Sequence, residues 1–182
     1  MESLQGKFLL ATPQMPDPRF RELVVYLCSH TAEGAMGVVI NQPSPYSLRE
    51  VFLGANITPP EGKSPPVYIG GPVEESAAFF LYSSEYQTEN FLEISDAVRI
   101  SGDAQILLDI SQGKGPKDYL FLLGYAGWGP GQLEQELTSN GWLSLPADYQ
   151  DIFNTPNEFK WKRVAARNGI DIALFADKIG NA

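Results

Sequence analysis

Tyr119-Leu-Phe-Leu-Leu-Gly-Tyr125 is the stretch that decides the fold class of this 182-residue chain. It contains no charged residue and shows no alternation of apolar with polar side chains. A strand of this kind is buried on both faces, as in the centre of a sheet that helices cover. We therefore expect residues 119–125 to form a central strand flanked by helices.

Four segments have the pattern of such helices. Ser47-Leu-Arg-Glu50 matches a capping box, in which serine and glutamate satisfy the free N–H groups of the first turn. A second helix is expected after Asp103, with apolar residues at helical spacing up to Gly113. Gln132–Asn140 and Pro156–Asn168 are each followed by glycine, which commonly ends a helix.

Short runs rich in β-branched or aromatic residues, separated by Pro, Gly and Asp, predict the strands. Leu23–His30 and Met36–Asn41 are separated by the polar turn Thr31–Gly34, which predicts an antiparallel hairpin. The other expected strands are Phe8–Ala11, Val67–Ile69, Ala77–Tyr82, Phe91–Ile94 and Ala97–Ile100.

A strand-rich first part with helices interspersed later predicts an α+β or mixed α/β fold with a mixed sheet, and not an all-β fold. The length is that of one ordinary domain, since domains cluster at about 100–150 residues. No internal repeat or low-complexity tract divides the chain. We expect a single domain over residues 1–182.

The charge balance is unfavourable for nucleic-acid binding. The chain has 13 basic and 22 acidic residues, a net charge of 13 − 22 = −9, which repels a phosphate backbone. The clearest basic concentration is Lys160-Trp-Lys-Arg163 with Arg167, expected on a solvated helix face. Glu158 and Lys162 have the spacing of a favourable helical ion pair.

Other features indicate a cytoplasmic protein. One cysteine cannot form an intramolecular disulfide, and the N-terminus has no secretory pattern. No apolar run approaches the length of about 20 residues that a spanning helix needs. One histidine, without a paired-cysteine or paired-histidine motif, predicts no metal site. No cofactor is expected, because nucleotide-binding fingerprints are absent.

The strongest local motif is a glycine-rich turn between the buried strand and the next helix, Gly124-Tyr-Ala-Gly127-Trp-Gly129-Pro-Gly131-Gln-Leu-Glu134. Glycines allow a backbone to approach a ligand closely, and successive N–H groups before a helix can hold an anion. Three interpretations stay open here: tight packing, binding of a small anionic molecule, or contact with a protein partner. The candidate ligand-binding residues are Gly124, Tyr125, Gly127, Trp128, Gly129, Gly131 and Gln132.

Two more turns could join this motif around one cleft. Asn41-Gln-Pro43 and Gly70-Gly-Pro72 each follow an expected strand and leave polar backbone free. Asn41, Gln42, Gly70 and Gly71 are therefore further candidate ligand-binding residues. The alternative is that both turns only reverse the chain.

Cys28-Ser-His30 is the one candidate for catalysis. A spacing of two places both side chains on the same face of a strand, where an imidazolium could activate the thiol. The alternative is a buried cysteine that only packs. The sequence does not predict a reaction, and an enzyme or redox-responsive protein using this pair is the second hypothesis.

In these motifs the chain resembles the AlgH/YqgE family, whose biochemical function is unassigned. The resemblance runs from Gly6 nearly to the C-terminus and rests on five segments. These are Leu4-Gln-Gly-Lys-Phe-Leu-Leu-Ala-Thr-Pro13, Met15-Pro-Asp-Pro-Arg-Phe20, His30 with Gly34-Ala-Met-Gly-Val-Val-Ile-Asn41, Tyr68-Ile-Gly-Gly-Pro-Val73 and the glycine-rich turn.

The resemblance implies a bifurcated mixed sheet partly closed into a small barrel and surrounded by helices. It implies no catalytic residue. One family member carries the label of a transcriptional regulator, so a regulator without an evident DNA-binding motif is the third hypothesis. The family commonly has a basic residue where this chain has Gln42. The leading hypothesis is a cytoplasmic regulatory or ligand-binding module with a glycine-rich cleft.

Overall fold

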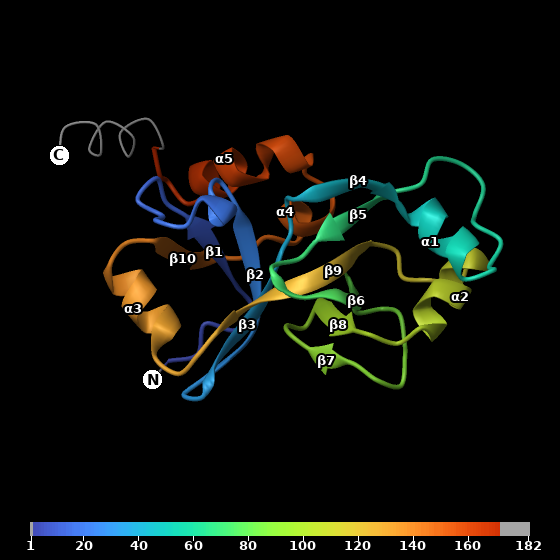
Figure 1. Ribbon diagram of the computed structural model, residues 1–182, viewed down its shortest axis with the longest axis horizontal. Helices are drawn as coiled ribbons and strands as arrows, with labels where there is room; N and C mark the ends of the chain where they lie inside the picture. The colour runs from blue at the N-terminus through green and yellow to red at the C-terminus, as the bar shows by residue number, and fades with distance from the viewer. Residues whose placement is uncertain (1, 172–182) are drawn as a thin grey trace. The chain divides into compact units, whose positions relative to one another are not determined.

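The computed structural model describes residues 2–171 of the chain (Figure 1). The chain divides into two compact units, Met1–Gln42 with Ala126–Ala182, and Pro43–Tyr125. Each unit has its own cluster of buried apolar side chains. Strand β9 (Tyr119–Trp128) belongs to both units: residues 119–125 lie in the second unit and residues 126–128 in the first. That both units belong to one folding domain stays a prediction.

The sheet of the first unit is antiparallel throughout the described residues. Its order is β10 (Trp142–Pro146), β1 (Lys7–Ala11), β2 (Val24–Thr31), β3 (Gly34–Val39) and the end of β9. The expected hairpin is confirmed, because β2 and β3 are adjacent and antiparallel. A 3-10 turn, η1 (Pro18–Phe20), lies between β1 and β2.

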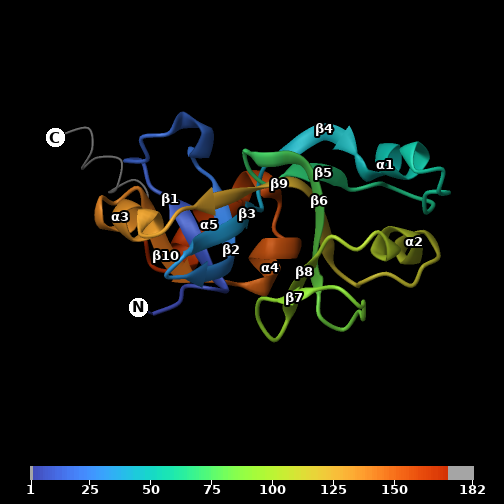
Figure 2. The ribbon, with the colours of Figure 1, turned by 60° about the horizontal axis from the view of Figure 1, so that its bottom comes forward.

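Helices pack on both faces of this sheet, as Figures 1 and 2 show. They are α3 (Gln132–Thr138), α4 (Tyr149–Phe153) and α5 (Asn157–Arg167). Leu133 of α3 is buried in one cluster with Leu9 of β1. Trp161 of α5 lines a small cavity with Leu10. Since successive side chains of a strand point to opposite faces, α3 and α5 cover opposite sides of β1.

In the second unit, β9 is the central strand that its sequence predicts. It pairs in parallel with β5 (Pro66–Ile69) and antiparallel with β6 (Val73–Ser83), so the sheet is mixed. Strands β8 (Val98–Ser101) and β7 (Leu92–Glu93) continue beyond β6, and β4 (Pro43–Ser47) pairs with β5.

Two short helices cover one face of this second sheet. They are α1 (Leu48–Gly54) and α2 (Gln105–Ser111). Phe52 and Ile106 pack with Phe121 of β9 in one buried cluster. The capping box at Ser47 is confirmed, and the side chain of Asp103 accepts from the backbone N–H of Gln105 at 3.0 Å.

The mixed α/β class is therefore confirmed, together with most of the expected elements. The structure adds β4, β10 and α4, which the sequence patterns did not predict, and it limits the expected strand at 91–94 to the two residues of β7. Within residues 2–171, no helix combines the length and apolarity that crossing a membrane requires.

Candidate functional site

The glycine-rich turn has two parts with different environments. Gly124 is buried in the second unit, and Tyr125 is half-buried. In the first unit, Gly127, Gly129, Gly131 and Gln132 are exposed, whereas Trp128 is 7% exposed. The seven candidates of this motif therefore do not share one surface environment.

In the second unit, three predicted glycines serve close packing of backbone. A Cβ atom on Gly70 would overlap the carbonyl oxygen of Gly124, and one on Gly124 would overlap that of Gly71. The backbone N–H of Gly70 donates to the Leu123 carbonyl at 2.7 Å. Gly70, Gly71 and Gly124 are all buried. These contacts favour the packing interpretation over ligand binding at these three positions.

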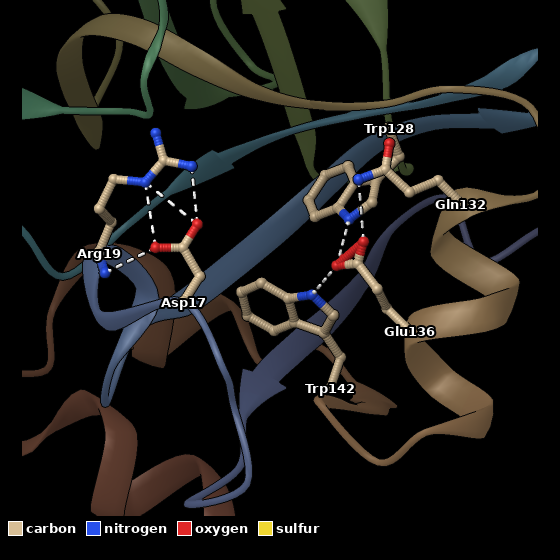
Figure 3. A network of polar contacts seen from close by, with 6 residues as sticks. All are labelled: Asp17, Arg19, Trp128, Gln132, Glu136 and Trp142. Carbon is tan, nitrogen blue, oxygen red and sulfur yellow. Dashed lines mark hydrogen bonds and ion pairs between the residues drawn. The ribbon is translucent and has the colours of Figure 1, made fainter.

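In the first unit, a network of internal hydrogen bonds holds the exposed part of the turn in place (Figure 3). The Gln132 side chain accepts from Gly129 N at 3.0 Å and donates to Glu136 at 3.0 Å. Glu136 Oε1 accepts from the indole N–H groups of Trp128 at 3.3 Å and Trp142 at 3.1 Å. With one loop N–H already bonded and a carboxylate beside it, this segment is poorly suited to an anion.

Cys28 and His30 have different hydrogen-bond partners, contrary to the expected pair. The pairing register of β2 with β3 shifts between Leu27 and Ser29, so the regular two-residue alternation is interrupted at Cys28. The Cys28 side chain is fully buried and donates to the Tyr26 carbonyl at 3.6 Å. Burial raises the pKa of the Cys28 thiol to about 12. This environment favours a packing role for Cys28.

We expect Cys28 to be inert in the folded protein. At pH 7.5 iodoacetamide should modify it only as fast as the chain unfolds, because both thiolate formation and access are blocked. Mass spectrometry over a time course would follow the reaction, with the same protein in denaturant as the control. Modification of folded protein at the rate seen in denaturant would restore the redox hypothesis.

His30 instead connects the N-terminal segment with α3. Its Nδ1 accepts from the backbone N–H of Leu4 at 2.9 Å, so Nε2 carries the proton and donates to Glu134 at 2.6 Å. This hydrogen bond is the main cause that lowers the pKa of Glu134 below its usual value. His30 is 5% exposed and both its ring nitrogens are engaged. The arrangement is that of a structural bridge.

The expected basic face on α5 is only partly exposed. Lys160 is 1% exposed and Trp161 8%, which corrects the expectation that this run is a solvated surface. Lys160 donates to the carbonyls of Ile40 at 2.7 Å and Ile152 at 2.9 Å. Both the aliphatic part and the amine of this lysine are therefore buried in the protein core. That the chain does not bind nucleic acid stays a prediction.

The stability of the folded protein should depend on pH through the titration of Lys160. Burial lowers the pKa of Lys160 from 10.5 to about 7, against the opposing charge of Asp151. Between pH 7 and pH 10.5, Lys160 is protonated in the unfolded chain but neutral in the folded protein. The free energy of unfolding should therefore rise with pH by up to about 1.4 kcal/mol per pH unit. Below pH 7 both states are protonated, and the full cost of burying the charge remains.

The measurement is denaturant unfolding at pH 7.0 and 8.5 for the wild type and for Lys160→Met, which keeps the apolar stem. We expect the wild type to gain about 1–2 kcal/mol more than the variant over this interval. Equal gains in the two proteins would show that Lys160 titrates normally.

Two adjoining cavities in the first unit form a concave surface among the described residues. The larger has a volume of about 410 Å³ and is lined by Thr12, Pro13, Arg21, Glu22 and Trp161. The smaller has about 230 Å³ and shares Arg21, Glu22 and Trp161 with it. Its other lining residues are Leu23, Asn41, Asn157, Glu158 and Lys162.

Each wall of these cavities is held by the fold. Thr12 follows β1 and its hydroxyl donates to the Asn140 carbonyl. The Trp161 indole N–H donates to the carbonyl of Ala11 at 2.8 Å, which fixes the ring beside the end of β1. Arg21 and Glu22 lie between η1 and β2. The cavities therefore lie where β1, β2, β3 and α5 meet.

Asn41 is the predicted site residue that belongs to this surface. Its side chain accepts from Val24 N at 3.0 Å and donates to the Glu22 carbonyl at 2.9 Å. Glu22 has φ 54°, a left-handed conformation that costs a non-glycine residue about 1–2 kcal/mol. Strain of this kind persists where the surroundings enforce it, often at ligand sites. Asn41 thus positions Glu22, while Gln42 lines neither cavity.

Sequence patterns did not point to Thr12, Arg21, Glu22 or Asn157 as site residues. The positive φ of Glu22 has no sequence signal, since glutamate is not typical of that conformation. Trp161, within a charged helix, was the one feature of the sequence that could have indicated this surface. A tryptophan among charged residues often has one part buried and another part in contact with water.

Comparison with known proteins places these features in a family. The model of the AlgH-like family matches residues 8–173. A UPF0301 protein of Desulfotalea psychrophila is 45% identical over 181 residues, covering 99% of this chain and 95% of the relative. A UPF0301 protein of Nitrosococcus oceani is 41% identical over 98% of this chain and 96% of the relative.

Two solved structures are also similar. The AlgH protein of Pseudomonas aeruginosa has a TM-score of 0.80 and 40% identity, covering 96% of this chain and 93% of that one. A protein of Corynebacterium diphtheriae has a TM-score of 0.75 at 21% identity, covering 96% and 92%, which concerns the fold alone. Since the family model spans both compact units and relatives above 40% identity cover almost the whole sequence, the chain belongs to the AlgH-like family.

Proposed function

We propose that this protein is a cytoplasmic small-molecule-binding module whose site is the pair of adjoining cavities in the first unit. The observation that carries the proposal is the cavity of about 410 Å³ between the end of β1, the segment before β2, and α5. This volume lies within the range of about 300–1,000 Å³ that is usual for ligand pockets.

The lining has the mixture of groups that a ligand pocket needs. Pro13 and Trp161 provide apolar surface, while Arg21 and Glu22 provide charged groups. The backbone of Glu22 is held by the Asn41 side chain. Pockets of this kind gain affinity from the apolar wall and orientation from a few polar groups. The proposed site replaces the glycine-rich cleft as the leading candidate, because Gly70, Gly71 and Gly124 lie in close backbone packing and Gly129 is bonded within its own loop.

No reaction is proposed for the module. A nucleophile must be accessible and activated, and the thiol of Cys28 is fully buried with its pKa raised to about 12. Binding without chemistry is therefore the function that the geometry supports best.

The proposal can be tested on natively purified protein. Compounds released from the wild type by solvent denaturation are identified by mass spectrometry and compared with those from a double variant, Arg21→Glu with Glu22→Arg. The exchange leaves the net charge at −9 but reverses the charges at the cavity. We expect one compound to be released from the wild type and about tenfold less from the variant.

Retention of the same compound at the same occupancy by the charge-exchanged variant would place the ligand elsewhere. Circular dichroism of both proteins serves as the control for folding. Release of buffer components alone from the wild type would contradict the proposal.

A further inference from the structure

The two cavities present charges of both signs that are not neutralised within the described part of the chain. Arg21 and Glu22 line both cavities, and Glu158 and Lys162 line the smaller one. All four residues are exposed. The ion pairs formed between described residues involve none of them.

The absence of a Glu158–Lys162 ion pair is informative, because their spacing on α5 favours one. The sequence pattern predicts this pair, whereas in the structure each side chain lines the cavity without reaching the other within ion-pair distance. Both groups are therefore available to a ligand without the breaking of an ion pair between them.

The balance of charges selects the class of ligand. An anion would be attracted by Arg21 and Lys162 but repelled by Glu22 and Glu158. A cation would be attracted by the two glutamates and repelled by the arginine and the lysine. With two charges of each sign around the cavities, neither gains a net advantage. A molecule that carries both an ammonium and a carboxylate group can place each beside its opposite.

The apolar residues that line the cavities indicate the uncharged part of the ligand. Trp161 and Pro13 form an apolar wall in the larger cavity, and Leu23 borders the smaller one. A side chain with an aliphatic or aromatic end would bury its surface there, while its charged groups stay beside Arg21 and Glu22. The volume of about 410 Å³ is ample for a molecule of this size.

We propose that the ligand is a free amino acid with an apolar or aromatic side chain, bound as a zwitterion between the charges of Arg21 and Lys162 and those of Glu22 and Glu158. This inference rests on the proposed function of the same cavities. The enforced backbone conformation of Glu22, held through Asn41, fixes the origin of one of the two acidic groups.

The test uses two matched series measured by isothermal titration calorimetry on the full chain. The first is L-phenylalanine, phenethylamine and 3-phenylpropanoate, which share the phenyl ring and chain length but carry both charges, the ammonium alone or the carboxylate alone. The second is L-leucine, 3-methylbutylamine and 4-methylpentanoate. We expect the amino acid of at least one series to bind about tenfold more tightly than both of its single-charge analogues.

Two variants divide the effect between the charges. Arg21→Gln should weaken binding of the amino acid and the carboxylate, and Glu22→Gln that of the amino acid and the amine. Arg163→Gln is the matched control, because Arg163 is exposed on α5 and lines neither cavity. Equal affinities within both series would overturn the zwitterion while leaving a ligand-binding cavity in place. Equal losses with Arg163→Gln would show that the loss does not depend on charges at the cavities, and would also overturn the zwitterion.

Failure of the proposed function itself has a different signature. In that case none of the six compounds binds, and native purification releases no compound from the wild type. A released compound that lacks one of the two charges would overturn the zwitterion and support the cavity.

Discussion

Gly124→Ala is expected to lower the free energy of unfolding by about 2–5 kcal/mol. Gly124 has φ 76°, which costs an alanine about 1–2 kcal/mol. The new methyl group would also overlap the Gly71 carbonyl oxygen and approach the Val73 carbonyl oxygen at 3.2 Å, and overpacking of this kind costs about 1–3 kcal/mol more. Thermal unfolding should shift downward by roughly 2–4 °C per kcal/mol.

Gly131→Ala is the matched control for the backbone conformation alone. Gly131 has φ 75°, and a Cβ atom built there meets no atom within 4 Å. We expect it to lose only the cost of about 1–2 kcal/mol for the left-handed conformation. Equal losses for the two variants would show that backbone packing around Gly124 is looser than the contacts with Gly71 indicate.

Asp151→Ala is expected to destabilise the protein by about 3 kcal/mol. The carboxylate is fully buried between α4 and α5, where it accepts from Thr155 Oγ1 at 2.7 Å and from Arg167 Nε at 2.7 Å. Removing one partner of a buried pair costs about 3–5 kcal/mol, and the lower end applies because the Arg167 side chain is 43% exposed. The loss also removes the negative charge that supports protonation of Lys160.

Asp151→Asn retains a side-chain oxygen for Thr155 but removes the charge opposite Arg167. We expect about half the loss of Asp151→Ala, measured by urea unfolding of the wild type and both variants at pH 7. If both variants lose less than about 1 kcal/mol, the contact between Asp151 and Arg167 is as weak as an exposed ion pair.

The elements predicted well are those whose signal is local. The unbroken apolar run of β9 predicts a buried central strand, and the polar turn at 31–34 predicts the β2–β3 hairpin. The capping box at Ser47 likewise depends on residues within one turn. By contrast, β10 was not predicted, because Trp142–Pro146 lacks a strand pattern and gains its order by pairing with β1.

The candidate site could not be predicted from the sequence because its groups come together only through tertiary contacts. Thr12, Arg21, Asn41 and Trp161 lie on four separate segments that meet at the end of one sheet. The Cys28–His30 hypothesis stays untested, although the structure favours packing of Cys28 for a related reason. It assumed regular alternation along β2, whereas the register shift between Leu27 and Ser29 and burial of the thiol depend on neighbouring strands.

The most direct test of the cavity as a binding site is the location of amide shifts in the ¹⁵N-labelled protein. The titrants are a panel of amino acids, phosphorylated metabolites and carboxylates. At least one compound should shift the amides of Arg21, Glu22 and Leu23 together with those of residues 157–162, while the amides of residues 127–132 stay unchanged. Shifts confined to residues 127–132, or none across the panel, would contradict the account.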